Sequence, residues 1–142
     1  MGSPRKIILA EDNLADAQLT RIAFDELDVN LEVVHVVDGQ KLLDYLKSSS
    51  HEEIALILLD LNMPRMGGLE VLKVMYEDEE LRNLPVVVLS SSAHESDVKT
   101  CYEYGANAYV RKPIDMEEFH KSIRSIAYFW GEVNVLPVFV NI

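Results

Sequence analysis

Five polar residues stand where apolar runs of the sequence end: Glu11, Asp12, Asp60, Ser90 and Lys112. Two of these runs end in acids, one in a hydroxyl and one in a base. Three carboxylates that share one crevice repel one another unless some are protonated, so their meeting would imply a bound cation. Because the set offers hard oxygen ligands without histidine or thiolate, we expect Mg²⁺ there, with Mn²⁺ as the second choice.

The expected metal ligands are the side chains of Asp12 and Asp60, the main-chain oxygen of Asn62, and Glu11 directly or through a water molecule. An alternative role for Asp12 with the following Asn13 is to cap a helix. Taken alone, the pair leaves both interpretations open.

Lys112 and Ser90 extend the expected site beyond a metal. A metal ion and an ammonium together overcompensate an aspartate pair, so they suit an additional dianion. Ser90 supplies a hydroxyl that can donate to an oxygen of that anion. Because phosphoryl transfer needs mainly positioning and charge stabilisation, the pattern predicts this chemistry, with Asp60 as the carboxylate nucleophile.

Alternating strands and helices must position these residues. Short apolar runs at 6–10, 31–37, 54–59, 85–89 and 108–110 predict strands, and segments with helical apolar spacing follow each of them. In the fourth helix this spacing puts Val98, Cys101 and Tyr102 on the buried side. The absence of hairpin signals favours an α/β fold with a doubly wound five-stranded parallel sheet in the order 2-1-3-4-5. The polar residues then share the carboxyl-terminal rim, where such sheets bind ligands.

Composition limits the class of protein. The chain has 142 residues, 49% of them hydrophobic, which fits one compact domain with a real core. It shows no membrane span and no secretory signal, so we expect a cytoplasmic protein. Cys101 is the sole cysteine, which excludes a disulfide framework and a thiolate metal site. The net charge of -11 argues against nucleic-acid binding.

The motifs together resemble a response-regulator receiver domain of the stand-alone, CheY-like type. The resemblance runs from about residue 6 to 128 and rests on Glu11 with Asp12, the stretch DLNMPRMGG from Asp60, VVVLSS, and YVRKP around Lys112. It implies that Asp60 accepts a phosphoryl group, with Mg²⁺ required, from the phosphohistidine of a sensor kinase or a phosphotransfer protein. It also implies that Lys112 and Ser90 bind the phosphoryl oxygens.

The same resemblance implies further roles in and beside the site. Tyr109 swings inward as Ser90 moves, and the bond between Lys112 and Pro113 is cis. The family usually has alanine or glycine where this chain has Ser91, which with Asn62 would border the path of a water attacking the acyl phosphate. No substrate turnover is expected.

We expect a receiver domain at 5–130 and an apolar extension at 131–142, which packs on its own domain or forms a partner or dimer arm. The extension is rich in apolar residues: Val133, Val135, Leu136, Val138, Phe139, Val140 and Ile142. Phe129 with Trp130, and Leu136 with Pro137, are similar to the carboxyl ends of receivers that partner bacterial and cyanobacterial phytochromes. This implies a phytochrome-type kinase and a homodimer through the fourth helix, fifth strand, fifth helix and extension.

Three other functions compete with a terminal receiver. A flavodoxin-like cofactor carrier would need a hydroxyl- and glycine-rich loop after the first strand, where two acids stand instead. A metal-dependent aspartyl-phosphate phosphatase would need an aspartate at the position of Asn62. An intermediate in a phosphorelay remains open, because the sequence names neither the kinase nor the target.

Overall fold

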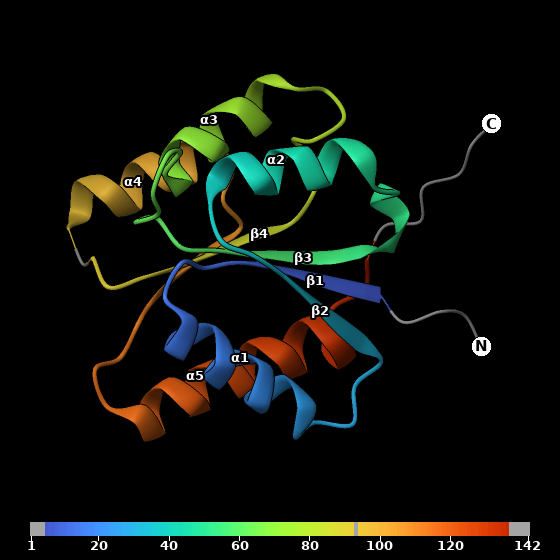
Figure 1. Cartoon of the computed structure of the whole chain (residues 1–142), viewed down its shortest axis with the longest axis vertical. Helices are drawn as coiled ribbons and strands as arrows, with labels where there is room; N and C mark the ends of the chain where they lie inside the picture. The colour runs from blue at the N-terminus through green and yellow to red at the C-terminus, as the bar shows by residue number, and fades with distance from the viewer. Residues whose placement is uncertain (1–4, 93, 137–142) are drawn as a thin grey trace.

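The computed structural model describes residues 5–92 and 94–136, which form a five-stranded sheet in the order β2-β1-β3-β4-β5 (Figure 1). Its strands are β1 (Arg5–Ala10), β2 (Leu31–Val36), β3 (Ile54–Leu59), β4 (Val86–Ser90) and β5 (Ala108–Arg111). Every neighbouring pair is parallel. The predicted doubly wound sheet is therefore confirmed.

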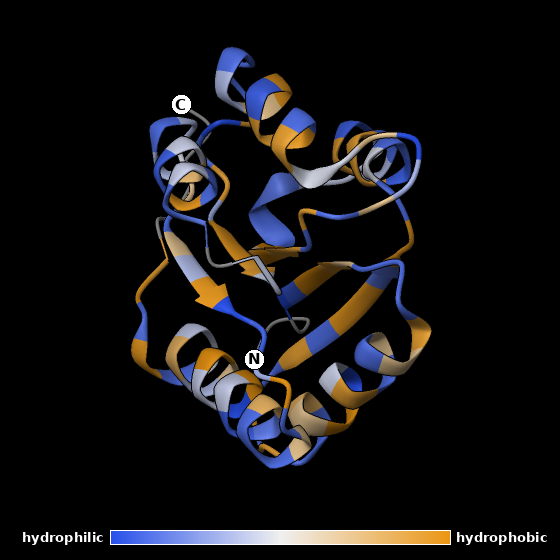
Figure 2. Ribbon diagram, turned by 90° about the vertical axis from the view of Figure 1, so that its left-hand side faces the viewer, coloured by the Kyte–Doolittle hydropathy of each residue, from blue (hydrophilic) through white to orange (hydrophobic). Residues whose placement is uncertain are grey.

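Helices cover both faces of the sheet. One face carries α2 (Gly39–Ser48), α3 (Gly68–Glu77) and α4 (Glu95–Glu103), and the other carries α1 (Leu14–Asp25) and α5 (Met116–Tyr128) (Figure 1). A short 3₁₀ helix, η1 (His51–Glu53), precedes β3. In Figure 2 the strands are orange over much of their length, with some blue segments, and lie between helices in which blue and orange alternate, as expected for amphipathic helices packed on a sheet.

The central strand β3 explains how Asp60 is held. All six of its residues are buried, because helices cover both of its faces. Ile57 and Leu59 belong to the apolar cluster under α2, α3 and α4, whereas Leu56 and Leu58 belong to the one under α1 and α5. Asp60 thus follows a strand that is buried along its whole length.

Tyr102 was placed wrongly by helical spacing. Its side chain is half-exposed, and its hydroxyl accepts a hydrogen bond from the Tyr109 backbone N–H at 3.1 Å. β5 is an edge strand, so its outward N–H groups lack a strand partner. Tyr102 stays at the surface because it satisfies one of them.

The described part of the extension lies against its own domain. A π-helix, η2 (Phe129–Val133), continues α5, and Trp130 and Leu136 pack on the cluster under α1 and α5. Gly131 lies close to β2, since a Cβ there would lie 2.9 Å from Leu31 Cδ1 and 3.1 Å from Val29 Cβ. The predicted apolar residues at 138–142 lie outside the described residues. Among those described, no helix has both the length and the apolar character needed to cross a bilayer.

Candidate functional site

The carboxyl ends of β1 and β3 bring three acids together. The Glu11 N–H donates to Val36 O and the Asp60 N–H donates to Ala10 O, both at 3.0 Å, so the first residue after each strand extends the sheet. Carboxylate oxygens of Glu11, Asp12 and Asp60 all lie within 4.8 Å of one another. Glu11 and Asp60 are buried, whereas Asp12 is exposed. The cluster can therefore be reached from solvent on the Asp12 side.

The ammonium of Lys112, the first residue after β5, reaches into this cluster. Its Nζ donates to Glu11 Oε1 at 2.5 Å and to Asp16 Oδ2 at 3.1 Å, and it lies 3.8 Å from Asp60 Oδ2. The lysine side chain is only 12% exposed. Burial lowers the pKa of Lys112, but its partners, Glu11 foremost, outweigh burial and raise the pKa above its ordinary value. Lys112 stays protonated at neutral pH.

Asp60 has the most perturbed carboxyl of the site. Burial raises its pKa most, and the neighbouring Glu11 raises it further, to about 7. The Lys112 charge and a hydrogen bond from the Asn62 N–H to Asp60 Oδ1, at 3.3 Å, only partly oppose this. Because nearby like charges raise the pKa of an acid, the Asp60 carboxyl is only partly ionised near neutral pH unless a cation binds beside it.

A tight loop after β3 fixes the Asp60 backbone. The Gly68 N–H donates to Leu61 O at 3.0 Å, and a Cβ on Gly68 would lie only 2.4 Å from Asp60 O. Arg65 adopts a positive φ of 64°, which a non-glycine residue rarely takes, and its guanidinium lies 3.6 Å from the buried carboxylate of Asp38. The loop is thereby tied to the start of α2.

Ser90 and Tyr109 are linked through a residue that the sequence did not single out. Ser90 is fully buried and its Oγ accepts from the Ser92 N–H at 3.1 Å. The Tyr109 hydroxyl donates to the carbonyl of Ser92 at 2.9 Å. Ser91, which lies between Ser90 and Ser92 in the sequence, is exposed. A movement of Ser90 would therefore displace Ser92, and with it the carbonyl that the Tyr109 hydroxyl contacts.

The predicted cis bond before Pro113 is wrong. The described residues contain no cis peptide bond. Trans is the lower-energy form of an X-Pro bond by about 0.5–1 kcal/mol. The Lys112 N–H donates to Ser90 O at 2.8 Å, so pairing with the end of β4 already aims the lysine at the site.

Two further residues at the rim were missed. Asp16 lies in the first turn of α1, where acids are common for helix stability alone, yet its side chain pairs with Lys112. His35 Nε2 lies 2.7 Å from Glu11 O. Asp12 does not cap α1, because Asn13 does so by accepting from the Asp16 N–H at 3.0 Å. In the sequence, only the position of Asp16 one helical turn after Asp12 could have indicated that Asp16 belongs to the rim.

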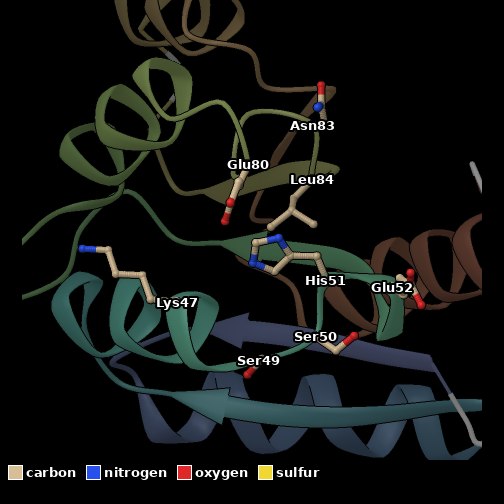
Figure 3. Close-up of a pocket in the computed structure, with 8 residues that line it drawn as sticks. All are labelled: Lys47, Ser49, Ser50, His51, Glu52, Glu80, Asn83 and Leu84. Carbon is tan, nitrogen blue, oxygen red and sulfur yellow. The ribbon is translucent and has the colours of Figure 1, made fainter. Parts of the chain in front are cut away.

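A polar hollow lies at the opposite end of β3, around η1 (Figure 3). Its lining residues are Lys47, Ser49, Ser50, His51, Glu52, Glu80, Asn83 and Leu84. Figure 3 shows Glu80 pointing toward the His51 ring, and His51 Nε2 lies 2.7 Å from Leu46 O. Ligands of parallel sheets bind at the carboxyl ends of the strands, so this amino-terminal hollow is not the candidate site.

Known proteins share the fold and about a third of the sequence. A family model described as the response regulator receiver domain matches residues 7–124. The response regulator Rcp1 of Synechocystis sp. is 34% identical over 138 residues, covering 94% of each chain. The crystal structure of Mn²⁺-bound Rcp1 covers 95% of this chain and 100% of its own, with a TM-score of 0.89 and 33% identity. That of the phosphorylated cyanobacterial phytochrome response regulator RcpA covers 94% and 99%, with a TM-score of 0.88 and 37% identity.

Proposed function

The chain belongs to the response regulator receiver domain family, and from this premise we propose that Asp60 is its phosphoacceptor, taking a phosphoryl group from the phosphohistidine of a sensor kinase. The protein is a two-component signalling receiver, a phosphoacceptor rather than an enzyme that turns over a substrate. One observation supports Asp60 above all. It is a buried carboxylate that lies within 4.8 Å of two other carboxylates and 3.8 Å from a buried ammonium.

The transfer needs one bond to form and one to break. An Asp60 carboxylate oxygen bonds to phosphorus while the bond from phosphorus to the donor imidazole nitrogen breaks, and the imidazole keeps that electron pair. The Lys112 ammonium and the Ser90 hydroxyl donate to phosphoryl oxygens. These groups stabilise charge and fix position, which is what phosphoryl transfer mainly requires.

The acids fit a divalent cation. Their oxygens are hard donors within 4.8 Å of one another, and one flank is open to solvent, as Mg²⁺ requires to keep some of its water. We propose that Asp12, Asp60, Glu11 and the main-chain oxygen of Asn62 hold Mg²⁺ or Mn²⁺. When bound, the ion neutralises charge on the phosphoryl oxygens. Rcp1 has been crystallised in a Mn²⁺-bound form, which supports this proposal.

The response passes from Ser90 to Tyr109. Ser90 would shift toward a phosphoryl oxygen, and Ser92, bonded to both Ser90 Oγ and the Tyr109 hydroxyl, would move with it. The Tyr109 ring, which is half-buried against the cluster under α2, α3 and α4, would shift with Ser92 and change the surface formed by α4, β5 and α5. The hydrogen bond from the Tyr109 N–H to the Tyr102 hydroxyl carries the change to α4.

The cognate kinase is of phytochrome type in this proposal. RcpA is a phytochrome response regulator, and the solved AtBRR, 38% identical over 94% of this chain, is a bacteriophytochrome response regulator.

We divide the chain into a receiver domain at 5–130 and an extension at 131–142. The extension and the surface of α4, β5 and α5 would form a homodimer arm, which light scattering with and without residues 131–142 would test.

Intact mass after incubation with Mg²⁺ and acetyl phosphate tests the central proposal. We expect one phosphoryl adduct on the native chain and none on Asp60→Asn. An adduct on both chains, or on neither, would refute Asp60 as phosphoacceptor. Turnover of a generic phosphomonoester would instead favour the phosphatase alternative.

A further inference from the structure

Among the described residues, Asp16 is the one partner of the Lys112 ammonium that belongs neither to the acidic triad nor to the residues proposed to bind the phosphoryl group. Its Oδ2 accepts from Lys112 Nζ at 3.1 Å, closer than the 3.8 Å between that nitrogen and Asp60 Oδ2. An ammonium has three protons to donate. Two are committed here, to Glu11 and Asp16.

The helix holds Asp16 firmly at this place. Its N–H donates to Asn13 Oδ1 at 3.0 Å, and its carbonyl accepts from the buried Thr20 hydroxyl at 2.8 Å. The Asp16 side chain is only 28% exposed, so water screens its charge incompletely. Asp16 is therefore a fixed negative charge beside the lysine and not a surface acid that meets it by chance.

We infer that Asp16 is a positioning residue that competes with the phosphoryl group for Lys112. Phosphorylation of Asp60 would replace a single carboxylate charge by a dianion that needs the ammonium. Asp16 keeps drawing the ammonium the other way. It therefore limits how readily Asp60 is phosphorylated. The inference deepens the proposed function and rests on it.

Asp16→Asn separates charge from structure, because the amide keeps an acceptor oxygen but loses the charge. We expect phosphorylation by acetyl phosphate, at saturating Mg²⁺, to become roughly three- to tenfold faster, the size of losing one charge in a partly buried site. Asp25→Asn, at the exposed far end of the same helix, removes the same formal charge and serves as the matched control. It should leave the rate unchanged.

Two readouts exclude a merely structural effect. Removing a negative charge should strengthen binding of the anion beryllofluoride, a phosphoryl mimic, without strengthening that of Mg²⁺, whereas a distorted site would weaken both. The rate gain should also largely vanish in a Lys112→Gln background, because Asp16 acts through that lysine. An equal gain there, or no gain in the native background, would overturn the inference.

The result can be told apart from a failure of the proposed function. If the native chain gains no adduct, or gains one that Asp60→Asn keeps, both proposals fall. If the native chain is phosphorylated at Asp60 and Asp16→Asn is no faster, only the role of Asp16 falls.

Discussion

Replacing Asp60 by asparagine should change how the stability of the metal-free protein depends on pH. Burial and Glu11 raise the pKa of Asp60 from 3.8 to about 7. The folded state thus binds this proton more tightly than the unfolded state does. The stabilisation is fully present below about pH 4 and is lost as pH rises through about 7. Asparagine does not titrate, so the variant should lose this part of the pH dependence.

The magnitude follows from the shift. Each pKa unit corresponds to about 1.36 kcal/mol, so the shift of Asp60 predicts a relative change of about 4 kcal/mol between pH 4 and pH 8. This is an upper value, since water can enter from the Asp12 side and relax the site. Even half of it would be a large fraction of the stability of a domain of this size.

Urea unfolding in EDTA at a series of pH values measures this change. The quantity of interest is the free energy of unfolding of Asp60→Asn minus that of the native chain, which cancels titrations common to both. We expect this difference to grow as pH rises, and to shrink when Mg²⁺ replaces EDTA, because a bound cation stabilises the ionised native site. A difference that stays flat from pH 4 to 8 would refute the argument.

Three other predictions concern the rim and the core. Gly68→Ala should lower the free energy of unfolding by about 1–3 kcal/mol and slow phosphorylation, because its Cβ would lie 2.4 Å from Asp60 O. Gly67→Ala, whose Cβ would lie 3.1 Å from Leu61 O, should have a smaller effect. Urea unfolding and intact mass would measure both effects. Ser91→Ala should alter autodephosphorylation more than phosphorylation, measured as decay and gain of the adduct, and equal effects would count against it. Cys101 should react with iodoacetamide far more slowly in the native than in the unfolded chain at pH 8, because its thiol is fully buried and burial raises its pKa to about 11; comparable rates would contradict this.

The sequence predicted the sheet and the rim well because both depend on strong local signals. Six consecutive apolar residues in β3 identify a strand buried on both faces, and Asp60 ends that run. In a parallel sheet the strand ends share one rim, so placing Glu11, Ser90 and Lys112 there needed only the strand order.

Contacts that depend on a single side chain could not be predicted in this way. Helical spacing gave Tyr102 a buried position, but an unpaired N–H of the edge strand fixes it at the surface. The family resemblance suggested a cis bond before Pro113, yet pairing of Lys112 with the end of β4 is enough to direct the lysine. Asp16 carries an ordinary signal for a helix start, and only the distance to Lys112 gives it another role.

The rim is electrostatically unbalanced, and this imbalance links stability to function. Glu11, Asp12, Asp16 and Asp60 face a single ammonium in the described structure. Burial and then Glu11 raise the pKa of Asp60, and the neighbouring acids, Glu11 foremost, raise that of Lys112. A divalent cation reduces the excess of negative charge at the rim, which favours metal binding. A phosphoryl group adds negative charge again, which opposes phosphorylation. Substitutions that neutralise the triad should therefore stabilise the metal-free fold while they weaken metal binding, whereas neutralising Asp16 should favour the phosphorylated form. Asp16 thus differs from the triad in its expected effect although it contacts the same lysine.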